Sequence, residues 1–576
     1  MTVVASVASG GAAVEDLRAA CAARSAALDV AFTRHRGLAV AWARSCRWTD
    51  AHDDGRVLVV VDGRLHNLAD DTVGPAELIS RRYRARGAGV AGDLLGDFVI
   101  IVLDRPAARL LVARDPLGVR PWYQVTSGPS HAGATDVASL VAQPWVDTEL
   151  DETIAIEYLA MVVESRGDTL YRAVKTLPPG ATWVTEGGHA RTFAHHRWHL
   201  RPDLEIGWDD AVERCRSLLD EAVRCRLRVT GPATSELSGG LDSSAVVGTL
   251  VELGRDDVVA ARLVFDGPRA DERAYSDAVI AHWGIRAVSA PPWMPADGAP
   301  EELTHRLRRP VPDPHFMMFA GLHRLLLHHE RPDGLTGLGG DDAFAVCSPG
   351  SRVVSAFELR QGAVLAGIAR AGARHPRELW ARYIRPALHH LAPWKGDALP
   401  GWVRPDAAAR ADLPRLFRRR PPRVTGVAAI DERIANITTG YDAAILEERA
   451  VVADLAGRRD SHPFLDPRLI EATYGLNPWW PTRGDHTRAL QAEAYRDRLP
   501  PAVASRRSKA DFSEVFWPQL LDDEVLTAVR TGPLVEAGWL DPDGFSALVA
   551  NAQKGTPNAA IPLSRCVSLD RWLRAR

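Results

Sequence analysis

The stretch from Ser235 to Val247, SELSGGLDSSAVV, constrains the fold of this chain more than any other. A short segment at 229–237 precedes the glycines and can enter as a buried strand, and residues 245–253 then repeat apolar side chains with helical spacing. Gly254, directly after that pattern, is typical of the residue that ends a helix. The sequence therefore predicts a strand, a tight turn rich in glycine and serine, and a helix.

A turn of this kind favours a bound anion. Its bare backbone N–H groups and the positive end of the helix dipole both attract phosphate, and Gly239 and Gly240 let the backbone approach closely. Three serines add hydroxyl donors: Ser238, Ser243 and Ser244. Asp242 would repel phosphate unless a cation lay between them, so it is predicted to be a magnesium ligand. The alternative is a turn that only caps the helix.

The string SGGLDSS lacks the Gly-Lys-Ser/Thr of a Walker A loop, and it resembles the pyrophosphate-binding loop of the ATP pyrophosphatases. Within that group it is similar to the asparagine synthetase branch, which also includes β-lactam synthetases and lasso-peptide cyclases. The resemblance implies that the chain splits ATP into AMP and pyrophosphate while it adenylates a carboxylate. It also implies that ATP contacts Leu237, Ser238, Gly239, Gly240, Leu241, Asp242, Ser243 and Ser244.

Composition excludes several other classes of protein. A chain of 576 residues is long enough for two or more domains, and 46% hydrophobic with 25% charged residues is ordinary for a globular protein. The net charge of −3 argues against a nucleic-acid or membrane partner, and no run of about 18 apolar residues predicts a membrane span. The start of the chain does not resemble a signal peptide, and the six cysteines form no CxxC pair. We therefore expect a cytoplasmic protein with reduced thiols.

Residues 1–200 are predicted to form an α+β domain with a hairpin of strands at 97–104 and 109–114. Two blocks, Leu95 to Phe98 and Ala113 to Tyr123, resemble the glutaminase domain of class II amidotransferases. The resemblance implies a four-layer αββα sandwich for this part of the chain.

Glutaminase activity is not expected. The enzymes need an N-terminal cysteine whose own amine is the base, whereas position 2 is Thr2 and the Cys-Gly-Ile context of the family is missing. The family's Asn-Gly-Glu-Ile-Tyr-Asn stretch reads DGRLHN here, so that Asp62 replaces the amide and Arg64 replaces an acid. The domain is predicted to be an inactive scaffold, and ammonia from glutamine is not expected to be the nucleophile.

Residues 201–576 alternate strands and helices, which predicts a doubly wound parallel sheet with nucleotide at the carboxyl ends of its strands. Helices are expected at 208–227 and 315–330, and a strand at 258–265. Val264 lies where the resembling family makes a backbone contact to adenine, although its side chain could equally be an ordinary buried valine.

The segment Leu335 to Phe344, LTGLGGDDAF, resembles the second motif of the same family. The resemblance implies that Gly337 contacts ATP and that Asp341 is the second magnesium ligand, so that two carboxylates clamp a hard cation on the phosphates. Asp342 is left open between a ligand and a solvated acidic turn. Leu338 stands where asparagine synthetases carry glutamate and β-lactam synthetase carries tyrosine, which counts against both assignments.

The segment Arg506 to Phe512 resembles the Arg-x-x-Lys segment of the family. Lys509 is predicted to stabilise the negative charge that develops at the α-phosphate, the alternative being a solvated lysine. The arginine-rich segment 351–438 is predicted to be helical, and its basic run at 418–423 is either an exposed loop, a lid or a site for an acidic partner.

The strings ELSGG and DGRL are most similar to those of lasso-peptide cyclases. This resemblance implies ATP and Mg²⁺ as cofactors and a leader-cleaved core peptide as substrate, with a leader peptidase and a precursor-recognition protein as possible partners. An Asp or Glu side chain of the peptide is adenylated, and the peptide's N-terminal amine then closes a macrolactam. The alternatives are a β-lactam or carbapenam synthetase, an asparagine-synthetase-like amidotransferase, and a non-catalytic scaffold.

Overall fold

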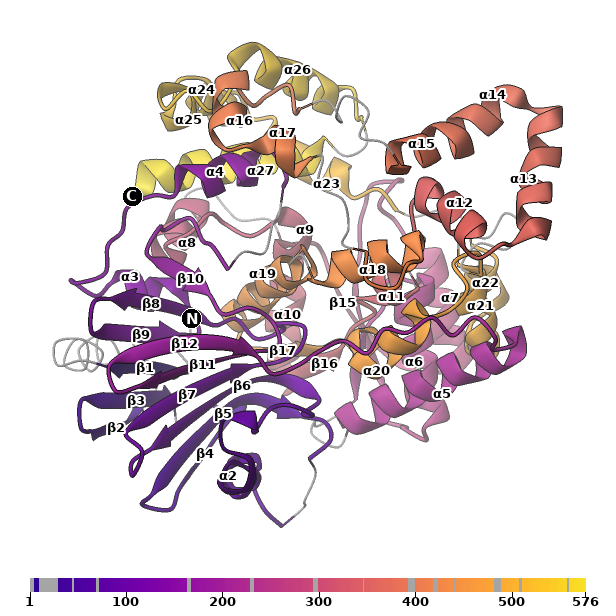
Figure 1. The fold of residues 1–576 in the computed structure, drawn as a ribbon. Helices are drawn as coiled ribbons and strands as arrows, with labels where there is room; N and C mark the ends of the chain where they lie inside the picture. Colours follow the sequence, from indigo (N-terminus) through magenta and orange to yellow (C-terminus); the bar gives the residue numbers. More distant parts are fainter. Residues whose placement is uncertain are drawn as a thin grey trace.

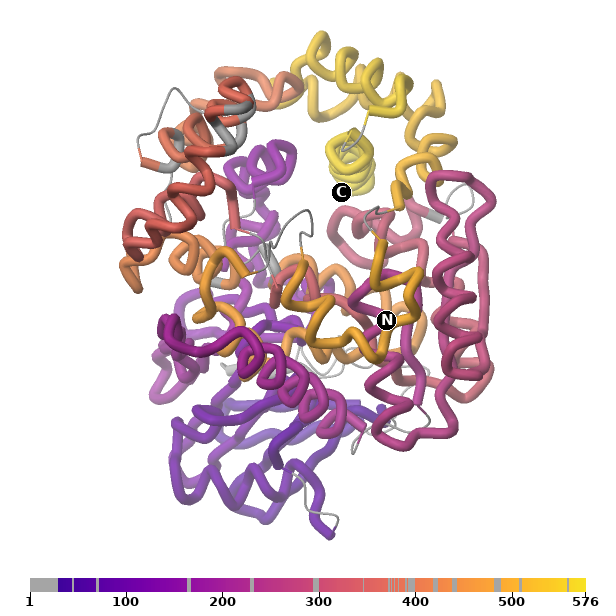
Figure 2. Tube along the Cα trace, turned by 90° about the vertical axis from the view of Figure 1, so that its right-hand side faces the viewer, coloured from indigo at the N-terminus to yellow at the C-terminus, as the bar shows by residue number. Residues whose placement is uncertain are grey.

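The structure is a computed structural model, and it describes residues 5–9, 30–43, 46–68, 72–162, 167–227, 233–293, 299–344, 347–391, 399–417, 423–438, 441–480, 488–506, 510–556 and 559–576. A strand-rich part, indigo to purple in Figure 1, packs against a larger and mostly helical part that runs from magenta to yellow. Figure 2 shows the same arrangement from the side, with the indigo strands below the helices.

The strand-rich part contains two antiparallel sheets of six strands each. The first has the order β10-β8-β9-β1-β3-β2 and consists of Ala5–Ser9 (β1), Val30–His35 (β2), Leu38–Ala43 (β3), Tyr123–Ser127 (β8), Ser130–Ala134 (β9) and Val174–Thr176 (β10). The second has the order β12-β11-β7-β6-β5-β4 and consists of Thr49–Asp53 (β4), Val57–Leu65 (β5), Gly96–Asp104 (β6), Arg109–Arg114 (β7), Ala181–Glu186 (β11) and His189–Ala194 (β12).

The alternation of side chains along β5 shows how the layers are held together. Val57, Val59 and Val61 pack against helix α2 (Pro75–Arg86), whereas Leu58 and Val60 face the other sheet. Because both faces of the sheet are buried at its centre, β5, β6 and β7 are apolar at most positions, whereas the edge strands β4 and β12 are largely polar.

Helices cover both outer faces of the sheet pair. Helix α2 lies on the second sheet, and α3 (Val137–Val141) packs on β8 and β9 of the first, close to α4 (Glu152–Leu159). The predicted αββα sandwich is therefore confirmed. The predicted hairpin is confirmed as well, with Asp104 opposite Arg109 at its closed end.

The helical part is built on a sheet of five parallel strands in the order β15-β14-β13-β16-β17. The strands are Thr234–Glu236 (β13), Val259–Leu263 (β14), Arg286–Ala290 (β15), Asp333–Leu335 (β16) and Arg459–Ser461 (β17). The chain leaves β13 towards β14 and β15 and later returns to β16 on the other side, so the strand order reverses beside β13. The predicted parallel sheet is confirmed, and such a reversal is where α/β proteins bind ligands.

The helix predicted at 208–227 is confirmed at its bounds, and the one predicted at 315–330 is not. α5 spans Trp208–Leu227, and α7 spans Arg273–Trp283 and ends at Gly284 in the left-handed conformation. The continuous helix expected at 315–330 is wrong, because α9 (Pro314–Met317) and α10 (Ala320–His328) are separate. The Met318 carbonyl between them accepts a hydrogen bond from the Trp293 N–H at 2.8 Å, outside either helix.

The remaining elements of the second part are mostly helical, as expected for its middle segment. They are α6 (Leu241–Glu252), α8 (Ala299–Leu307), α11 (Gly340–Ala343), α12 (Pro349–Glu358), α13 (Gly362–Arg374), α14 (Pro376–Leu379), α15 (Arg385–Leu391), α16 (Pro405–Arg410), α17 (Leu413–Leu416), α18 (Ala428–Thr438), α19 (Tyr441–Leu455), α20 (Pro467–Tyr474), α21 (Ala489–Ala494), α22 (Pro501–Ala504), α23 (Ser513–Leu520), α24 (Asp523–Arg530), α25 (Pro533–Glu536), α26 (Pro542–Gln553) and α27 (Ala560–Ala575). The basic residues 418–422 lie outside the described residues.

Two general expectations, on the cysteines and on membrane spans, can be compared with the structure. The five cysteines among the described residues are buried and unpaired. Within the described ranges, no helix combines the length and the apolar character that a membrane crossing requires. The two parts share one apolar core in which Tyr123 and Leu159 join Phe516 and Trp572, so they pack as one body.

The stability of this fold should fall in mild acid because of His66. Burial, followed by repulsion from Arg226, lowers the pKa of His66 to about 3. Below pH 6.5 the imidazole of His66 is protonated in the unfolded chain but stays neutral in the native protein. The free energy of unfolding should therefore fall by about 1.4 kcal/mol per pH unit from this residue alone. Urea unfolding at pH 7 and pH 5 measures the loss, which should be smaller for His66→Gln. Equal losses for both proteins would contradict this assignment.

Candidate active site

The glycine-rich turn joins β13 to α6, as the sequence predicts. Gly240 is the residue before the helix, and Gly239 has φ +82°. A Cβ atom on Gly239 would lie 2.6 Å from the Tyr275 Cβ and 2.6 Å from the Ser276 N. The backbone of the turn thus lies directly against α7, where only glycine fits.

Gly239→Ala should therefore destabilise the protein by about 1–3 kcal/mol and weaken nucleotide binding. The matched control is Gly254→Ala, because Gly254 has the same φ of +82° but no atom within 4 Å of the added Cβ. Thermal unfolding and calorimetric titration with ATP give the two readouts. If the two variants lose the same stability, the contact with α7 is not what requires glycine at position 239.

The hydroxyl groups of the turn are arranged before any ligand arrives. Ser238 Oγ lies 3.2 Å from Ser243 Oγ, and it accepts a hydrogen bond from the Gly240 N–H at 3.2 Å. Ser243 Oγ in turn accepts from the Ser238 N–H at 3.2 Å. The helix N-terminus and these hydroxyls face the same space, which suits a phosphate group.

The second glycine-rich loop packs directly on the first. A Cβ on Gly337 would lie 2.5 Å from the Ser243 N, and a Cβ on Gly340 would lie 2.1 Å from Asp242 Oδ1. Thr336 fixes this loop from behind, since its Oγ1 lies 2.7 Å from His462 Nδ1. Two segments about 100 residues apart in sequence are thereby held in contact at the carboxyl ends of β13 and β16.

One guanidinium group joins the two aspartates that the resemblance assigns to magnesium. Arg488 Nη1 donates to Asp242 Oδ2 at 2.8 Å and to Oδ1 at 2.9 Å, and its Nη2 forms an ion pair with Asp341. Gln491 Nε2 also donates to Asp242 Oδ1, at 2.5 Å. Burial raises the pKa of Asp242, and the positive charge of Arg488 opposes that shift. The two carboxylates are close enough to share one cation.

These groups open onto a cavity of about 510 Å³, a size within the range of small-molecule sites. All three motifs contribute to its wall: Leu237, Ser238, Gly240, Leu241, Asp242 and Ser243 from the first loop, Gly337, Leu338 and Asp341 from the second, and Arg506, Ala510 and Phe512 from the third. Four apolar side chains also line it: Phe265, Phe316, Met318 and Phe319. The wall thus combines polar groups that suit phosphate with aromatic and aliphatic surface.

Some predicted residues do not reach this cavity. Gly239, Ser244 and Val264 are not on its wall: Ser244 is fully buried, and the Val264 N–H donates to the Ala290 carbonyl at 2.9 Å. Asp342 is half-buried and is also off the wall. Lys509 and Thr2 lie outside the described residues, so their roles stay predictions.

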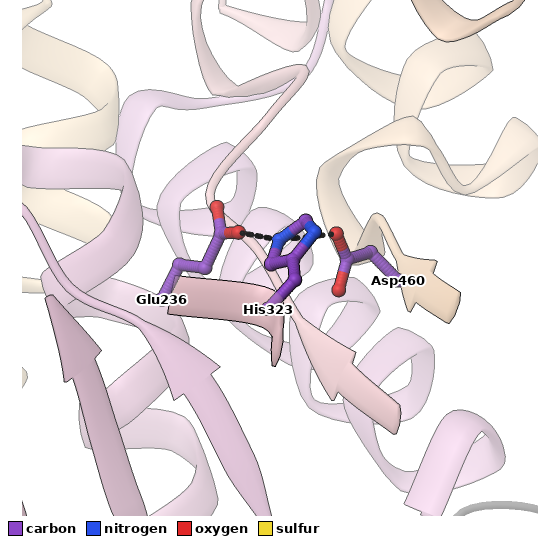
Figure 3. Close-up of side chains that lie close together, drawn as sticks. All are labelled: Glu236, His323 and Asp460. Atoms are coloured by element: carbon purple, nitrogen blue, oxygen red, sulfur yellow. Dashed lines mark hydrogen bonds and ion pairs between the residues drawn. The ribbon is translucent and has the colours of Figure 1, made fainter. Parts of the chain in front are cut away.

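A buried charged cluster adjoins the cavity through Glu236, which lies on its wall and contacts His323, with Asp460 on the other side of the imidazole (Figure 3). His323 Nε2 lies 3.1 Å from Glu236 Oε1 and 3.4 Å from Asp460 Oδ2. Arg449 pairs with both carboxylates, at 3.0 Å from Asp460 Oδ2, and Arg458 Nε donates to Asp460 Oδ1 at 3.1 Å. Burial lowers the pKa of His323, so the imidazole is neutral.

The carboxylates of this cluster are paired with arginines, which makes it poorly suited to binding a metal ion. Glu236, His323 and Asp460 offer ligand atoms within 4.8 Å of one another, a spacing that a cation could use. The guanidinium groups of Arg449 and Arg458 already supply two positive charges for the two carboxylates. A further cation would have to displace an arginine that is itself buried.

The residues that depart from the glutaminase pattern lie at the contact between the two parts of the molecule. Asp62 is completely buried, with Arg459 Nη2 at 2.5 Å from Oδ1 and Arg120 Nη2 at 3.2 Å from Oδ2. Arg64 forms a buried ion pair with Asp333 at the start of β16. Asp62 and Arg64 are therefore structural residues that join the two parts.

The sequence motifs do not indicate four residues at or beside the site: Arg488, Gln491, Arg449 and His323. Each is brought to the site by a contact spanning more than 80 residues, from a helix that carries no recognisable motif. A run of alternating charges such as LEERAVVADLAGRRD is typical of an exposed helix face, and burial of its arginines leaves no signal in the sequence.

The family model described as asparagine synthase matches residues 214–574, more than half of the chain. The chain belongs to the asparagine synthase family. Members of this family are ATP-dependent ligases that form amide bonds. The glutamine amidotransferase domain model matches residues 54–198, in the strand-rich part.

Relatives within the asparagine synthase family are distant. Asparagine synthetase 3 of Bacillus subtilis is 26% identical over 208 residues, which is 33% of this chain and 33% of that protein. Asparagine synthetase 1 of the same organism is 26% identical over 216 residues, 35% of this chain and 34% of that protein. The amidase chry2 of Gibberella zeae is 29% identical over 224 residues, 35% of this chain and 32% of that protein. The matched segments span about a third of each relative's length.

Proposed function

We propose that the protein is an ATP-dependent ligase that closes a macrolactam in a peptide, as a lasso-peptide cyclase does. The convergence of three sequence motifs on one cavity carries the proposal: the SGGLDSS loop, the second glycine-rich loop, and the third motif through its described residues Arg506, Ala510 and Phe512. Membership of the asparagine synthase family supports amide formation through a nucleotide.

The donors around the cavity fit ATP and a divalent cation. The α6 N-terminus and the hydroxyls of Ser238 and Ser243 suit the phosphates. Asp242 and Asp341 offer oxygen ligands of the kind that Mg²⁺ prefers, and their joint contact with Arg488 supports a place for positive charge between them. Magnesium, when bound, would neutralise phosphate charge at this place.

The reaction has two steps. A side-chain carboxylate oxygen of the peptide attacks the α-phosphorus of ATP, the bond to the β-phosphate breaks, and pyrophosphate leaves. The peptide's N-terminal amine then attacks the acyl carbon, the bond to AMP breaks, and the amine nitrogen loses a proton. The protein's main contribution to the second step is to hold amine and acyl carbon together, which is worth a large effective concentration.

Two observations favour an internal amine over ammonia from glutamine. Asp62 and Arg64, where the glutaminase stretch departs from its pattern, are occupied with ion pairs to the second part. The aromatic side chains on the cavity wall, among them Phe316, Phe319 and Phe512, provide apolar surface that a peptide can cover and that ammonia does not need. Leu338 on the wall offers neither the carboxylate nor the phenol of the related synthetases.

The test incubates the protein with ATP, Mg²⁺ and a leader-free peptide encoded by a short reading frame next to its gene. The expected products are AMP, pyrophosphate and a peptide lighter by one water. Parallel reactions replace the peptide with aspartate plus ammonia, aspartate plus glutamine, or a β-amino acid. Asparagine or a β-lactam as product would replace the cyclase by the corresponding alternative, and ADP as the nucleotide product would refute adenylation. Failure of ATP to bind would favour a non-catalytic scaffold.

A further inference from the structure

We propose that Arg488 is a phosphate-binding residue that shields Asp242 and Asp341 until nucleotide arrives. It offsets part of the negative charge of the two carboxylates in the absence of nucleotide, and it moves to the polyphosphate when metal and ATP enter together. This inference rests on the proposed ATP-dependent function, and it names a residue that the sequence motifs do not contain.

The geometry of the contact carries the first half of the proposal. Arg488 reaches both carboxylates at once: it is bidentate to Asp242, at 2.8 and 2.9 Å, and ion-paired to Asp341. The side chains of Arg488 and Asp242 are only 13% and 20% exposed, so this pair is largely shielded from solvent, whereas the Asp341 side chain is 54% exposed. A guanidinium held in this way occupies the position that a shared divalent cation would need.

Competition follows from this arrangement. A metal ion that binds the two carboxylates must displace Arg488, and a displaced guanidinium without a partner in a partly buried site is costly. Bare metal should therefore bind weakly. Gln491 stays beside Asp242 at 2.5 Å and keeps that carboxylate oriented when the arginine leaves.

Nucleotide removes this cost because it brings a new partner for the arginine. Arg488 and the first loop line the same cavity, so phosphate oxygens bound at the α6 N-terminus lie within the reach of its side chain. A planar guanidinium pairs with phosphate oxygens in the same two-pronged manner as with a carboxylate. Arg488 can thus exchange partners without losing its charge-assisted hydrogen bonds.

Arg488→Gln tests both halves with binding measurements alone. Mn²⁺ affinity without nucleotide, followed by electron paramagnetic resonance, should rise about 10- to 100-fold, because the carboxylates are left unpaired. Affinity for ATP with Mg²⁺, followed by calorimetry, should fall by a similar factor. Arg488→Lys keeps the charge but not the two-pronged geometry and should fall between the two. Arg496→Gln is the matched control, since Arg496 is 66% exposed and forms a surface ion pair with Glu493.

The outcomes separate this inference from the proposed function. If the wild-type protein binds ATP but Arg488→Gln changes neither affinity, or changes only one of them, the exchange of partners is overturned while the proposed function stands. If the wild-type protein binds no ATP, both fall together. Circular dichroism of Arg488→Gln identifies a variant that is unfolded, and Arg488→Lys then decides the question by the same two affinities.

Discussion

Asp242→Asn should lower AMP formation by about a hundredfold to a thousandfold while leaving the protein folded. The amide has nearly the shape of the carboxylate but no charge, so it holds neither a divalent cation nor Arg488, which donates to both oxygens of Asp242. The measurement is pyrophosphate release with ATP, Mg²⁺ and the peptide, alongside thermal unfolding.

The control for this variant is Asp342→Asn, one residue beyond Asp341 and off the cavity wall. The rate of pyrophosphate release by Asp342→Asn should fall less than tenfold, which would indicate a structural role for Asp342. A comparable loss of activity in both variants would indicate that Asp342 is also a metal ligand. Wild-type activity of Asp242→Asn would contradict a role of Asp242 in binding the metal.

Arg449→Leu should destabilise the protein by about 3–5 kcal/mol. Arg449 is buried between Glu236 and Asp460, and its removal leaves two buried carboxylates with less positive charge than they need. Urea unfolding at pH 7 measures the loss, and the transition should move to lower denaturant with little change in slope.

Two further variants test whether this loss of stability comes from unbalanced charge. Arg410→Leu breaks an exposed pair with Glu152 and should cost less than about 1 kcal/mol. Adding Glu236→Gln to Arg449→Leu removes one of the stranded charges and should recover part of the stability. If the double variant is no more stable than the single one, the loss comes from packing of the arginine stem and not from unbalanced charge.

The fold follows from the sequence where a pattern is long and local. The helix at 208–227 and the hairpin of β6 and β7 are set by periodicity over many residues, and their predicted bounds agree with the structure. The proximity of Asp242 and Asp341 was also predictable, because the carboxyl ends of neighbouring parallel strands meet at one edge.

The sequence could not show that the guanidinium of Arg488 lies between those carboxylates. Arg488 reaches them across 246 residues, and nothing in its local sequence distinguishes it from a surface arginine. The break between α9 and α10 is equally hidden, since it depends on a hydrogen bond from Trp293 on a distant segment. Such features arise from tertiary contacts, which override local preferences.

The ion pairs across the boundary of the two halves make them dependent on each other. Asp62 and Arg64 come from one half, and Arg459 and Asp333 from the other, and all four are buried. Separating the two parts would expose these buried charged groups to solvent and remove their ion-pair partners. A fragment holding only the helical part would expose Arg459 and Asp333 without their counterions, so we expect this part to depend on the strand-rich part for its stability.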